Sequence, residues 1–387
     1  MKHKLLALAA ALGGAAMTLP LAAAPAAPLP PPELEAIPVA LLFDVGSGQQ
    51  LYAKNEKLRF LPASVTKVMT AYLAFELIAQ GKLQTWQRYT VNPKTFAQWQ
   101  GQGSTMNLGR DESVSVDSLL QGLTTISAND AAVVLAEGFA GSVPVWCALM
   151  NAEARRLGMS DSHFNTPNGW PDEGATYVSA DDLVKLGEAL VTRHPELYHR
   201  YFGRQSMTWN GFTANNHDPN IGVVEGADGM KTGFTREAGY NYLGSAERGG
   251  RRLFMVLAKA QNGRERKAAS RALIEWGFAA WDARPLFAQG AQVGAARVQG
   301  GDAREVGLTA PFAIHSVAPR GVTQPVSLRI FYKGPIAAPI ARGARVAELE
   351  IASAGQIPRR VPLFAANSIG EASLLDRLVN GLVGIWT

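Results

Sequence analysis

The hydrophobic pattern of the chain changes twice, and these changes limit the folds it can adopt. Short strand-like segments occur near 39–53, apolar residues recur at helical spacing through much of 64–190, and strand-like segments return after Gly229. Beyond about Trp281 the segments are short and divided by Gly and Pro turns, with almost no helical spacing. The pattern predicts an α+β layered domain followed by a small all-β domain.

Individual elements follow from the same pattern. Val39–Phe43 and Gln50–Ala53 flank a Gly-containing turn and predict a hairpin. A helix is expected over Ser64–Ile78, between Pro62 and Gly81. The remaining predicted helices are Val116–Leu123, Ala131–Glu137, Val143–Leu157, Ala180–Leu190 and Lys267–Trp276, and the later strands are Tyr240–Ser245 and Leu253–Ala258.

Composition excludes several classes of protein. The formal net charge is +5, but no dense Lys/Arg run is interleaved with aromatic residues, so we expect no nucleic-acid role. Cys147 is the sole cysteine and has apolar neighbours, which favours a small core residue over a nucleophile. The six histidines show no H-E-x-x-H or other ligand spacing, so we expect neither a metal nor another cofactor.

Residues 1–26 have the order of a secretory signal peptide. A basic start precedes an apolar run from Leu5 through Ala16 and a cleavage-type sequence, Ala24-Pro25-Ala26. An uncleaved N-terminal anchor is the alternative, although the run is shorter than the ~20 residues that a bilayer needs. The body of the protein is therefore expected outside the cytosol.

Residues 367–387 predict an amphipathic helix. Leucines, valines and Trp386 fall on one half of a helical wheel, with Asp376 and Arg377 on the other. Such a helix is too short and too charged to span a bilayer but suits its interface. Packing of its apolar face on the β domain is the alternative.

Three short motifs occur in order: Ser64-Val65-Thr66-Lys67, Ser127-Ala128-Asn129 and Lys231-Thr232-Gly233. Each is a weak signal alone, but together and in suitable structural settings they are specific. Ser64 and Lys67 are three residues apart and share one face at the start of a helix. Apolar neighbours and a second cation would depress the pKa of Lys67, which makes it the candidate general base for a nucleophilic Ser64.

The second and third motifs supply groups for proton transfer and binding. Ser127 falls between two helical patterns, from where it can relay a proton to a leaving amine, and Asn129 can bind a substrate backbone or hold Lys67. A helix N-cap is the alternative for this motif. Gly233 permits close approach of a substrate, and the Phe234 N–H can join that of Ser64 in an oxyanion hole.

Lys231 is the candidate substrate-binding cation, with a solvated lysine in a turn as the alternative. The predicted binding residues are Asn129, Lys231, Thr232, Gly233 and Phe234.

With these motifs the chain resembles the low-molecular-mass penicillin-binding proteins, the D-alanyl-D-alanine carboxypeptidases of peptidase family S11. The resemblance covers nearly the whole chain and includes Gly103-Ser104-Thr105-Met106, Asn168-Gly169-Trp170 and Gly239-Tyr240-Asn241. It implies a β-lactamase-like fold and a zinc-free serine mechanism that removes the terminal D-alanine from peptidoglycan pentapeptide. It also implies that β-lactam antibiotics are covalent inhibitors.

The resemblance implies a role for several residues. Ser64 would be the acylated nucleophile, Lys67 the proton acceptor, Ser127 the second active serine and Lys231 the substrate-binding cation. An Arg after the last strand helps to bind the substrate carboxylate in this family. Arg266 best matches its spacing, with Arg264 or a merely solvated charge as alternatives.

Asp172 and the C-terminal segment also resemble features of the family. Asp172 resembles a family loop acid, although Trp170 stands where a leucine is expected and a solvated carboxylate is the alternative. The amphipathic C-terminus implies a periplasmic enzyme held on the outer face of the inner membrane. The predicted division is 1–26 signal peptide, 27–280 serine D,D-peptidase domain, 281–366 β domain and 367–387 membrane-anchor helix.

Three rival functions share parts of this pattern. A β-lactamase needs a dedicated glutamate for deacylation, but Glu173 lacks the expected surroundings and the β domain would be unexplained. A D,D-endopeptidase acting on wall cross-links needs the same machinery, so the sequence does not separate it. An inactive wall-binding protein requires the loss of a catalytic residue, and none is missing.

Overall fold

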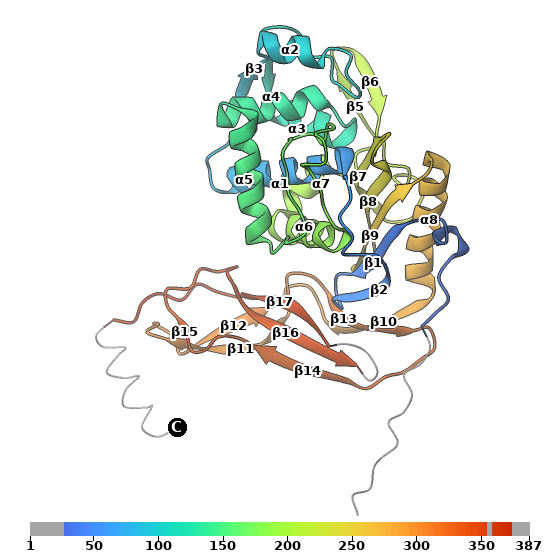
Figure 1. The fold of residues 1–387 in the computed structure, drawn as a ribbon. Coiled ribbons are helices and arrows are strands. Elements are labelled where there is room, and N and C mark those ends of the chain that lie inside the picture. The colour runs from blue at the N-terminus through green and yellow to red at the C-terminus, as the bar shows by residue number, and fades with distance from the viewer. Residues whose placement is uncertain (1–26, 354–357, 374–387) are drawn as a thin grey trace, which may run out of the picture.

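The structure, a computed structural model, describes residues 27–353 and 358–373. The predicted signal peptide and residues 374–387 of the predicted anchor lie outside the described residues. Figure 1 shows a first domain of helices and a central sheet, with a β domain lying across its lower end. The predicted combination of a mixed α/β domain and a later all-β domain is confirmed.

The central sheet has five antiparallel strands in the order β2-β1-β9-β8-β7. Both predicted hairpins are present, and β7 forms one edge of the sheet. Lys231 lies in the middle of β7 rather than in a turn. The strand bounds are β1 Val39–Asp44, β2 Gln49–Lys54, β7 Ala227–Thr235, β8 Gly239–Arg248 and β9 Arg251–Ala260.

Helices cover both faces of this sheet (Figure 1). Along β1, Val39 and Leu41 pack in the core formed with helices α1 to α7, while Ala40 and Leu42 pack on the opposite face with α8. Burial of both faces explains why the strands are so apolar. The helices are α1 Lys67–Ala79, α2 Pro93–Trp99, α3 Val116–Thr125, α4 Asn129–Ala140, α5 Val143–Arg156, α6 Ala180–Arg193, α7 Pro195–Tyr201 and α8 Gly263–Ala279.

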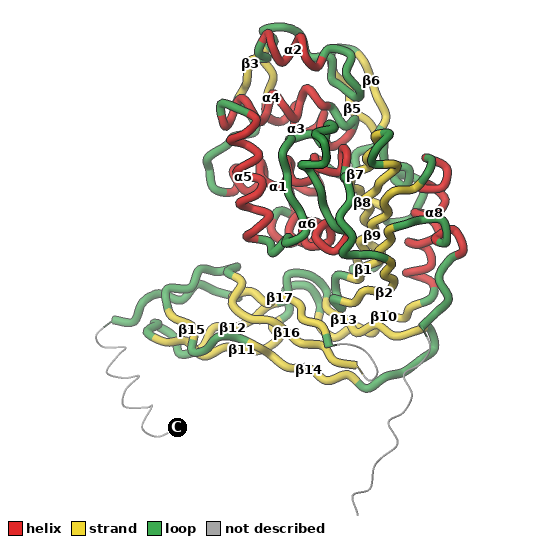
Figure 2. The backbone as a smooth tube through the Cα atoms, viewed as in Figure 1, coloured by secondary structure: helices red, strands yellow, loops and turns green. Residues whose placement is uncertain are grey.

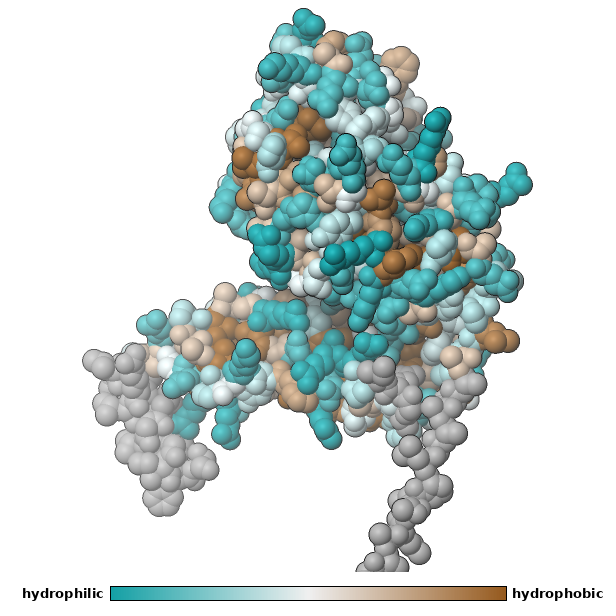
Figure 3. Space-filling model, in the orientation of Figure 1, coloured by the Kyte–Doolittle hydropathy of each residue, from teal (hydrophilic) through white to brown (hydrophobic). Residues whose placement is uncertain are grey.

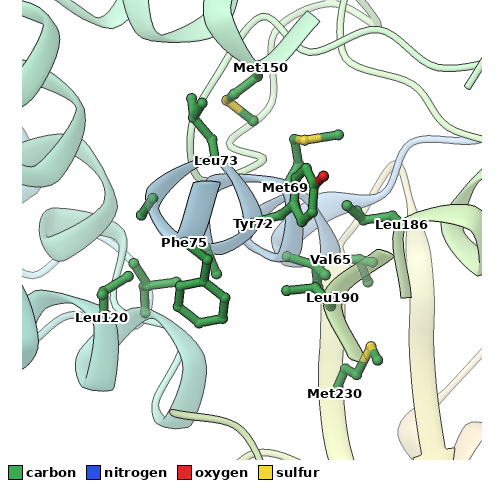
Figure 4. Packing of buried hydrophobic residues seen from close by; sticks show 14 of the residues in the cluster. Val65, Met69, Tyr72, Leu73, Phe75, Leu120, Met150, Leu186, Leu190 and Met230 are labelled. Carbon is green, nitrogen blue, oxygen red and sulfur yellow. The ribbon is translucent and has the colours of Figure 1, made fainter. Parts of the chain in front are cut away.

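Helix α1 is the central helix of the first domain. All of its residues from Lys67 through Leu77 are buried, and Figure 4 shows Tyr72 and Phe75 surrounded by side chains of neighbouring elements. The predicted helix start at Ser64 is corrected, because Ala63–Thr66 forms a 3₁₀ turn, η2, directly before α1. This central position fixes the turn that carries Ser64.

The β domain contains strands and loops but no helix within its described residues (Figure 2). Six of its strands form one sheet in the order β14-β16-β17-β12-β11-β15, and β10 pairs with β13. The bounds are β10 Trp281–Phe287, β11 Gln292–Gln299, β12 Glu305–Thr309, β13 Ile314–Pro319, β14 Val326–Phe331, β15 Ile336–Ala337, β16 Arg345–Ser353 and β17 Arg359–Ala365.

The β domain continues past residue 366. Ile369 bridges to Ile340 and Glu371 bridges to Gly301, and Ile369 is only 2% exposed. Residues 367–373 therefore belong to this domain, which corrects the predicted start of the anchor.

The remaining elements are short. The leader before β1 packs against the core through Leu34 and Ile37 and includes the 3₁₀ turn η1, Pro32–Leu34. No single helix among the described residues has the length and composition of a membrane span, and only the bent pair α4 and α5 passes that test together. The short hairpins are β3 Arg88–Thr90 with β4 Ser113–Ser115, and β5 Ser206–Trp209 with β6 Phe212–Asn215.

Candidate active site

Ser64 and Lys67 lie side by side at the start of the central helix. The Lys67 ammonium nitrogen is 2.9 Å from Ser64 Oγ. It also contacts Asn129 Oδ1 at 2.8 Å and the backbone carbonyl of Asn168 at 2.9 Å. The first motif therefore forms the predicted nucleophile–base pair, and two other segments fix the base.

The environment of Lys67 disfavours its charged form. The side chain is fully buried, and burial lowers the pKa of Lys67 well below its ordinary value. The nearby charge of Lys231 lowers this pKa further, while Asp130 partly opposes the shift. A neutral amine at Lys67 can accept the Ser64 proton.

Ser127 lies on a second wall, between α3 and α4. It has a left-handed backbone, φ 63°, and its residue lines the cleft together with Ser64 and Asn129. The N-cap position of α4 is Ala128, with no side-chain cap, so the N-cap interpretation of this motif is wrong. The strained backbone conformation directs the serine toward the cleft instead.

The loop over this wall is fixed by backbone contacts. Asp130 accepts hydrogen bonds from the N–H groups of Met106 and Leu108, and Asn129 Nδ2 donates to the Gln102 carbonyl. The segment that contains Gly103-Ser104 is thereby held at the rim of the cleft.

Strand β7 forms the third wall. A Cβ on Gly233 would lie 2.4 Å from the Pro62 carbonyl oxygen and 3.1 Å from the Ser64 nitrogen, so only glycine allows the strand to approach the nucleophile this closely. Lys231 is buried, and burial, with Arg266 nearby, lowers its pKa to about 7 although Asp218 opposes the shift. Its ammonium donates to the Thr232 carbonyl at 3.0 Å.

The walls enclose an open cleft of about 510 Å³. Arg266 lines it and Arg264 does not, which favours the predicted Arg266 over the alternative. The Arg266 guanidinium lies 5.5 Å from the Tyr240 ring, and Tyr240 stacks on Phe234 at 4.1 Å between centroids. The cleft residues among those predicted are Ser64, Ser127, Asn129, Thr232, Gly233, Phe234 and Arg266.

Eight residues that line the cleft were not among the predicted site residues: Gly103, Ser104, Asn168, Gly169, Trp170, His217, Thr235 and Tyr240. Burial and the charges of Lys231, Lys67 and Arg266 lower the pKa of His217 to about 4, so its imidazole is neutral at neutral pH. No local spacing in the sequence identifies this histidine. Asn168 and Trp170 were quoted only for their resemblance to the family.

The structure also shows the surroundings of Asp172 and Cys147. Asp172 accepts hydrogen bonds from the backbone and hydroxyl of Thr176, so its carboxylate shapes its own loop. Cys147 is 5% exposed in the core, and burial raises its pKa to about 12. No group of three or more His, Cys, Asp or Glu residues in the described part of the chain could hold a metal ion.

The comparisons with known proteins agree with this geometry. A protein family described as D-alanyl-D-alanine carboxypeptidase, peptidase S11, matches residues 25–262. The chain belongs to the D-alanyl-D-alanine carboxypeptidase family. Residues 281–371 match the C-terminal domain of penicillin-binding protein 5. The predicted family and its serine-type hydrolase class are confirmed.

Relatives in this carboxypeptidase family cover most of the chain. The D-alanyl-D-alanine carboxypeptidase DacD of Escherichia coli K12 is 33% identical over 354 residues, 90% of each protein. The crystal structure of penicillin-binding protein 5 from Haemophilus influenzae is 30% identical, with a TM-score of 0.69 over 87% of this chain and 98% of that one.

A third relative was solved with an antibiotic. Penicillin-binding protein D2 from Listeria monocytogenes in the ampicillin-bound form is 30% identical, with a TM-score of 0.57 over 63% of this chain and 97% of that one. The similarity to this penicillin-binding protein covers less of the chain than the previous two, and it links the chain to a protein that binds a β-lactam.

Proposed function

We propose that this carboxypeptidase removes the terminal D-alanine from peptidoglycan pentapeptide through an acyl-enzyme on Ser64. The observation that carries the proposal is the 2.9 Å contact between Ser64 Oγ and a fully buried Lys67 whose pKa is depressed. A neutral amine at that distance is a general base for a serine that is otherwise a weak nucleophile.

Acylation uses groups from all three walls. Lys67 accepts the Ser64 proton as Oγ attacks the carbonyl carbon between the two D-alanines. The backbone N–H groups of Ser64 and Phe234 stabilise the negative oxygen of the tetrahedral intermediate. Ser127 gives its hydroxyl proton to the leaving nitrogen and takes a proton back from Lys67. The C–N bond breaks, free D-alanine departs, and Lys67 is a neutral amine again.

The terminal carboxylate orients the substrate. We assign its binding to Lys231, Thr232 and Arg266, which bring cationic and hydroxyl groups to one end of the cleft. Asn129 offers its amide to the substrate backbone and holds Lys67 at the same time. Binding of a carboxylate also raises the pKa of Lys231 and so favours its charged form.

Hydrolysis then frees the enzyme. Water attacks the ester carbonyl, Lys67 takes a proton from it, and the Ser64–acyl bond breaks with the proton returned to Ser64. A β-lactam acylates the same oxygen, but its leaving group stays tethered to the acyl group. We therefore propose slow release of penicillins from Ser64.

The cellular location belongs to the same proposal. An export signal at 1–26 and an apolar-faced C-terminal segment support an enzyme in the periplasm, peripheral on the outer face of the inner membrane. Its substrate, the cell-wall peptide, is found in that compartment.

The test is incubation of wild type and Ser64→Ala with a diacyl-L-Lys-D-Ala-D-Ala peptide and, separately, with a fluorescent penicillin. Wild type should release D-alanine and become labelled, and Ser64→Ala should do neither, with an unchanged circular dichroism spectrum. Labelling of the variant at another serine would show that the nucleophile is wrongly assigned.

A further inference from the structure

Trp170 is held rigidly beside the catalytic cleft. Its ring meets that of the buried Trp99 edge to face, with centroids 5.2 Å apart, and its backbone N–H donates to Asn168 Oδ1 at 3.0 Å. A Cβ on Gly103 would lie 3.3 Å from the indole, so the ring also touches the opposite loop. The side chain is still 38% exposed, and the residue lines the cleft. These contacts preform an apolar surface at the cleft and limit the conformational freedom that the ring would lose on binding.

The cleft has a direction set by β7. Lys231 and the nearby Arg266 put cationic groups at one end, where the proposed function places the substrate's terminal carboxylate. The strand then runs past Gly233 to Thr235 at its other end. The acyl part of the substrate, which precedes the scissile bond, must therefore extend toward Thr235 and Trp170.

A small hollow continues the cleft in that direction. It shares Gly169, Trp170 and Thr235 with the main cleft, and it is also lined by Asp172 and Glu237. Glu237 is exposed. The cleft is thus cationic at the carboxylate end and carries two carboxylates just beyond the indole at the acyl end.

We propose that Trp170 is a specificity-determining residue that binds the side chain of the residue before D-Ala-D-Ala, and that the preferred side chain is a long aliphatic one ending in an ammonium group. Methylene groups lie against the indole, where burial of apolar surface favours them. The ammonium reaches the carboxylates of Asp172 and Glu237 and gains from the ring as a cation–π partner. This inference deepens the proposed function and rests on it.

Three peptides test the inference: Nα-acetyl-L-Lys-D-Ala-D-Ala, the same peptide with an acetylated side-chain amine, and Nα-acetyl-L-Ala-D-Ala-D-Ala. D-Alanine release by wild type should follow that order in kcat/KM, with lysine favoured over alanine by roughly 10-fold. In Trp170→Ala the lysine-to-alanine ratio should fall to about twofold or less, and Trp170→Leu should give an intermediate ratio because leucine restores some apolar surface.

Two controls separate specificity from damage. Trp86→Ala removes a tryptophan that is 74% exposed and does not line the cleft, and it should leave the ratio unchanged. The circular dichroism spectrum of Trp170→Ala should match that of wild type, which shows that a changed ratio does not come from unfolding. Glu237→Gln should reduce the preference for the free amine over the acetylated one.

The outcomes are distinguishable. Equal kcat/KM for the lysine and alanine peptides in wild type, or a ratio that survives Trp170→Ala, overturns the role of Trp170. Equal rates with the free and acetylated amines overturn the ammonium part. If no peptide releases D-alanine while penicillin still labels Ser64, the proposed function fails rather than this inference.

Discussion

At the scale of single residues, the chemistry depends on the protonation states of two buried lysines, Lys67 and Lys231. Burial depresses the pKa of both Lys67 and Lys231, and each lies in the field of a further cation. Lys231 also has the carboxylate of Asp218 in its field, which favours its charged form. The arrangement thus allows a neutral base and a cationic binding group to coexist in one site.

The pH dependence of kcat/KM should reveal this division. A lysine with a depressed pKa is charged only below that pKa, so Lys231 should lose its affinity for the substrate carboxylate as the pH rises through about 7. We expect an alkaline limb there in D-alanine release, caused mainly by a rising KM. Lys231→Arg keeps its charge and should remove that limb, whereas Lys82→Arg, at an exposed position, should not. A limb unchanged in Lys231→Arg would contradict the assignment.

The sequence predicted the reacting residues because their motifs are local. Ser64 and Lys67 are three residues apart, and one helical turn brings them together. His217 could not be found in this way, because it joins the cleft from a loop after β6 and its environment is made by residues distant in sequence. The Asn168 contact with Lys67 is made by a backbone carbonyl, which any residue type can provide.

At the scale of elements, the cleft depends on a tight contact between the 166–170 turn and the Ser64 turn. Lys67 donates to the Asn168 carbonyl, and Thr70 Oγ1 donates to the Pro167 carbonyl at 2.6 Å. Gly169 has a left-handed backbone, φ 75°, and a Cβ there would lie 1.8 Å from the Ala63 carbonyl oxygen. No side chain fits between these two turns.

Gly169→Ala should therefore displace the Ser64 turn or the Asn168 carbonyl. We expect penicillin acylation to fall by roughly 100-fold, since misplacing a catalytic group by about 1 Å has that effect. Gly174→Ala is the matched control, because Gly174 is also left-handed, φ 86°, but a Cβ there would meet nothing nearer than Leu61 Cδ2 at 4.0 Å. It should show only the backbone penalty of about 1–2 kcal/mol in stability. Equal acylation rates in the two variants would contradict the steric argument.

The sequence predicted whether a segment is a helix or a strand better than it predicted where the element begins and ends. Helix α6 and the β8–β9 hairpin follow from strong periodicity and turn residues. The 3₁₀ turn before α1 could not be predicted, since packing against β7 and the 166–170 turn decides that Ser64 stays outside the α-helix. Helices α2 and α7 have seven residues each, too few for a periodic signal.

At the scale of the whole molecule, a buried ionic cluster joins the two domains. Asp44 at the end of β1 contacts His315 Nε2 of β13 at 2.6 Å and Arg251 Nε of β9 at 2.7 Å. Arg251 also donates to the carbonyl of Trp281, the first residue of β10. All three side chains are buried, so the cluster is a polar contact of the interior. The face of the molecule in Figure 3 mixes hydrophilic and hydrophobic residues.

Asp44→Ala should be strongly destabilising because it leaves Arg251 buried without its carboxylate. We expect a loss of about 3–5 kcal/mol in the free energy of unfolding, measured by urea denaturation. Asp282→Ala, which removes an exposed carboxylate of the β domain, should cost at most about 1 kcal/mol. Similar losses in the two variants would contradict the importance of the cluster.

The stabilisation by Asp44 should be lost at low pH. Hydrogen bonds and charges from His315 and Arg251 outweigh burial, which acts in the opposite direction, and lower the pKa of Asp44 to about 2. The stabilisation is therefore complete above the unfolded-state pKa of about 3.9 and is lost as the pH falls toward 2. The difference in stability between wild type and Asp44→Ala should shrink over that interval.

Residues 367–373 pack in the β domain, whereas the proposed membrane contact is made by the segment that follows them. Two truncations separate these roles. Ending the chain after Ser373 removes residues 374–387 and keeps Ile369 and Ala372, which are 2% and 7% exposed in the β domain. Ending it after Ala366 removes these core residues as well, together with the bridges to Ile340 and Gly301. The first cut should thus leave stability unchanged, and the second should lower it by about 2 kcal/mol or more.

Membrane binding should be lost in both truncated forms. The apolar face of the C-terminal segment has only Arg377 as a nearby cation, so its affinity should come from apolar burial and depend little on salt or on anionic lipid. Full-length enzyme should therefore sediment with phosphatidylcholine vesicles, and the chain ending at Ser373 should stay in the supernatant with full D-alanine release. If the full-length chain also stays in the supernatant, or if the chain ending at Ser373 unfolds, the segment packs on the protein and the anchor proposal is wrong.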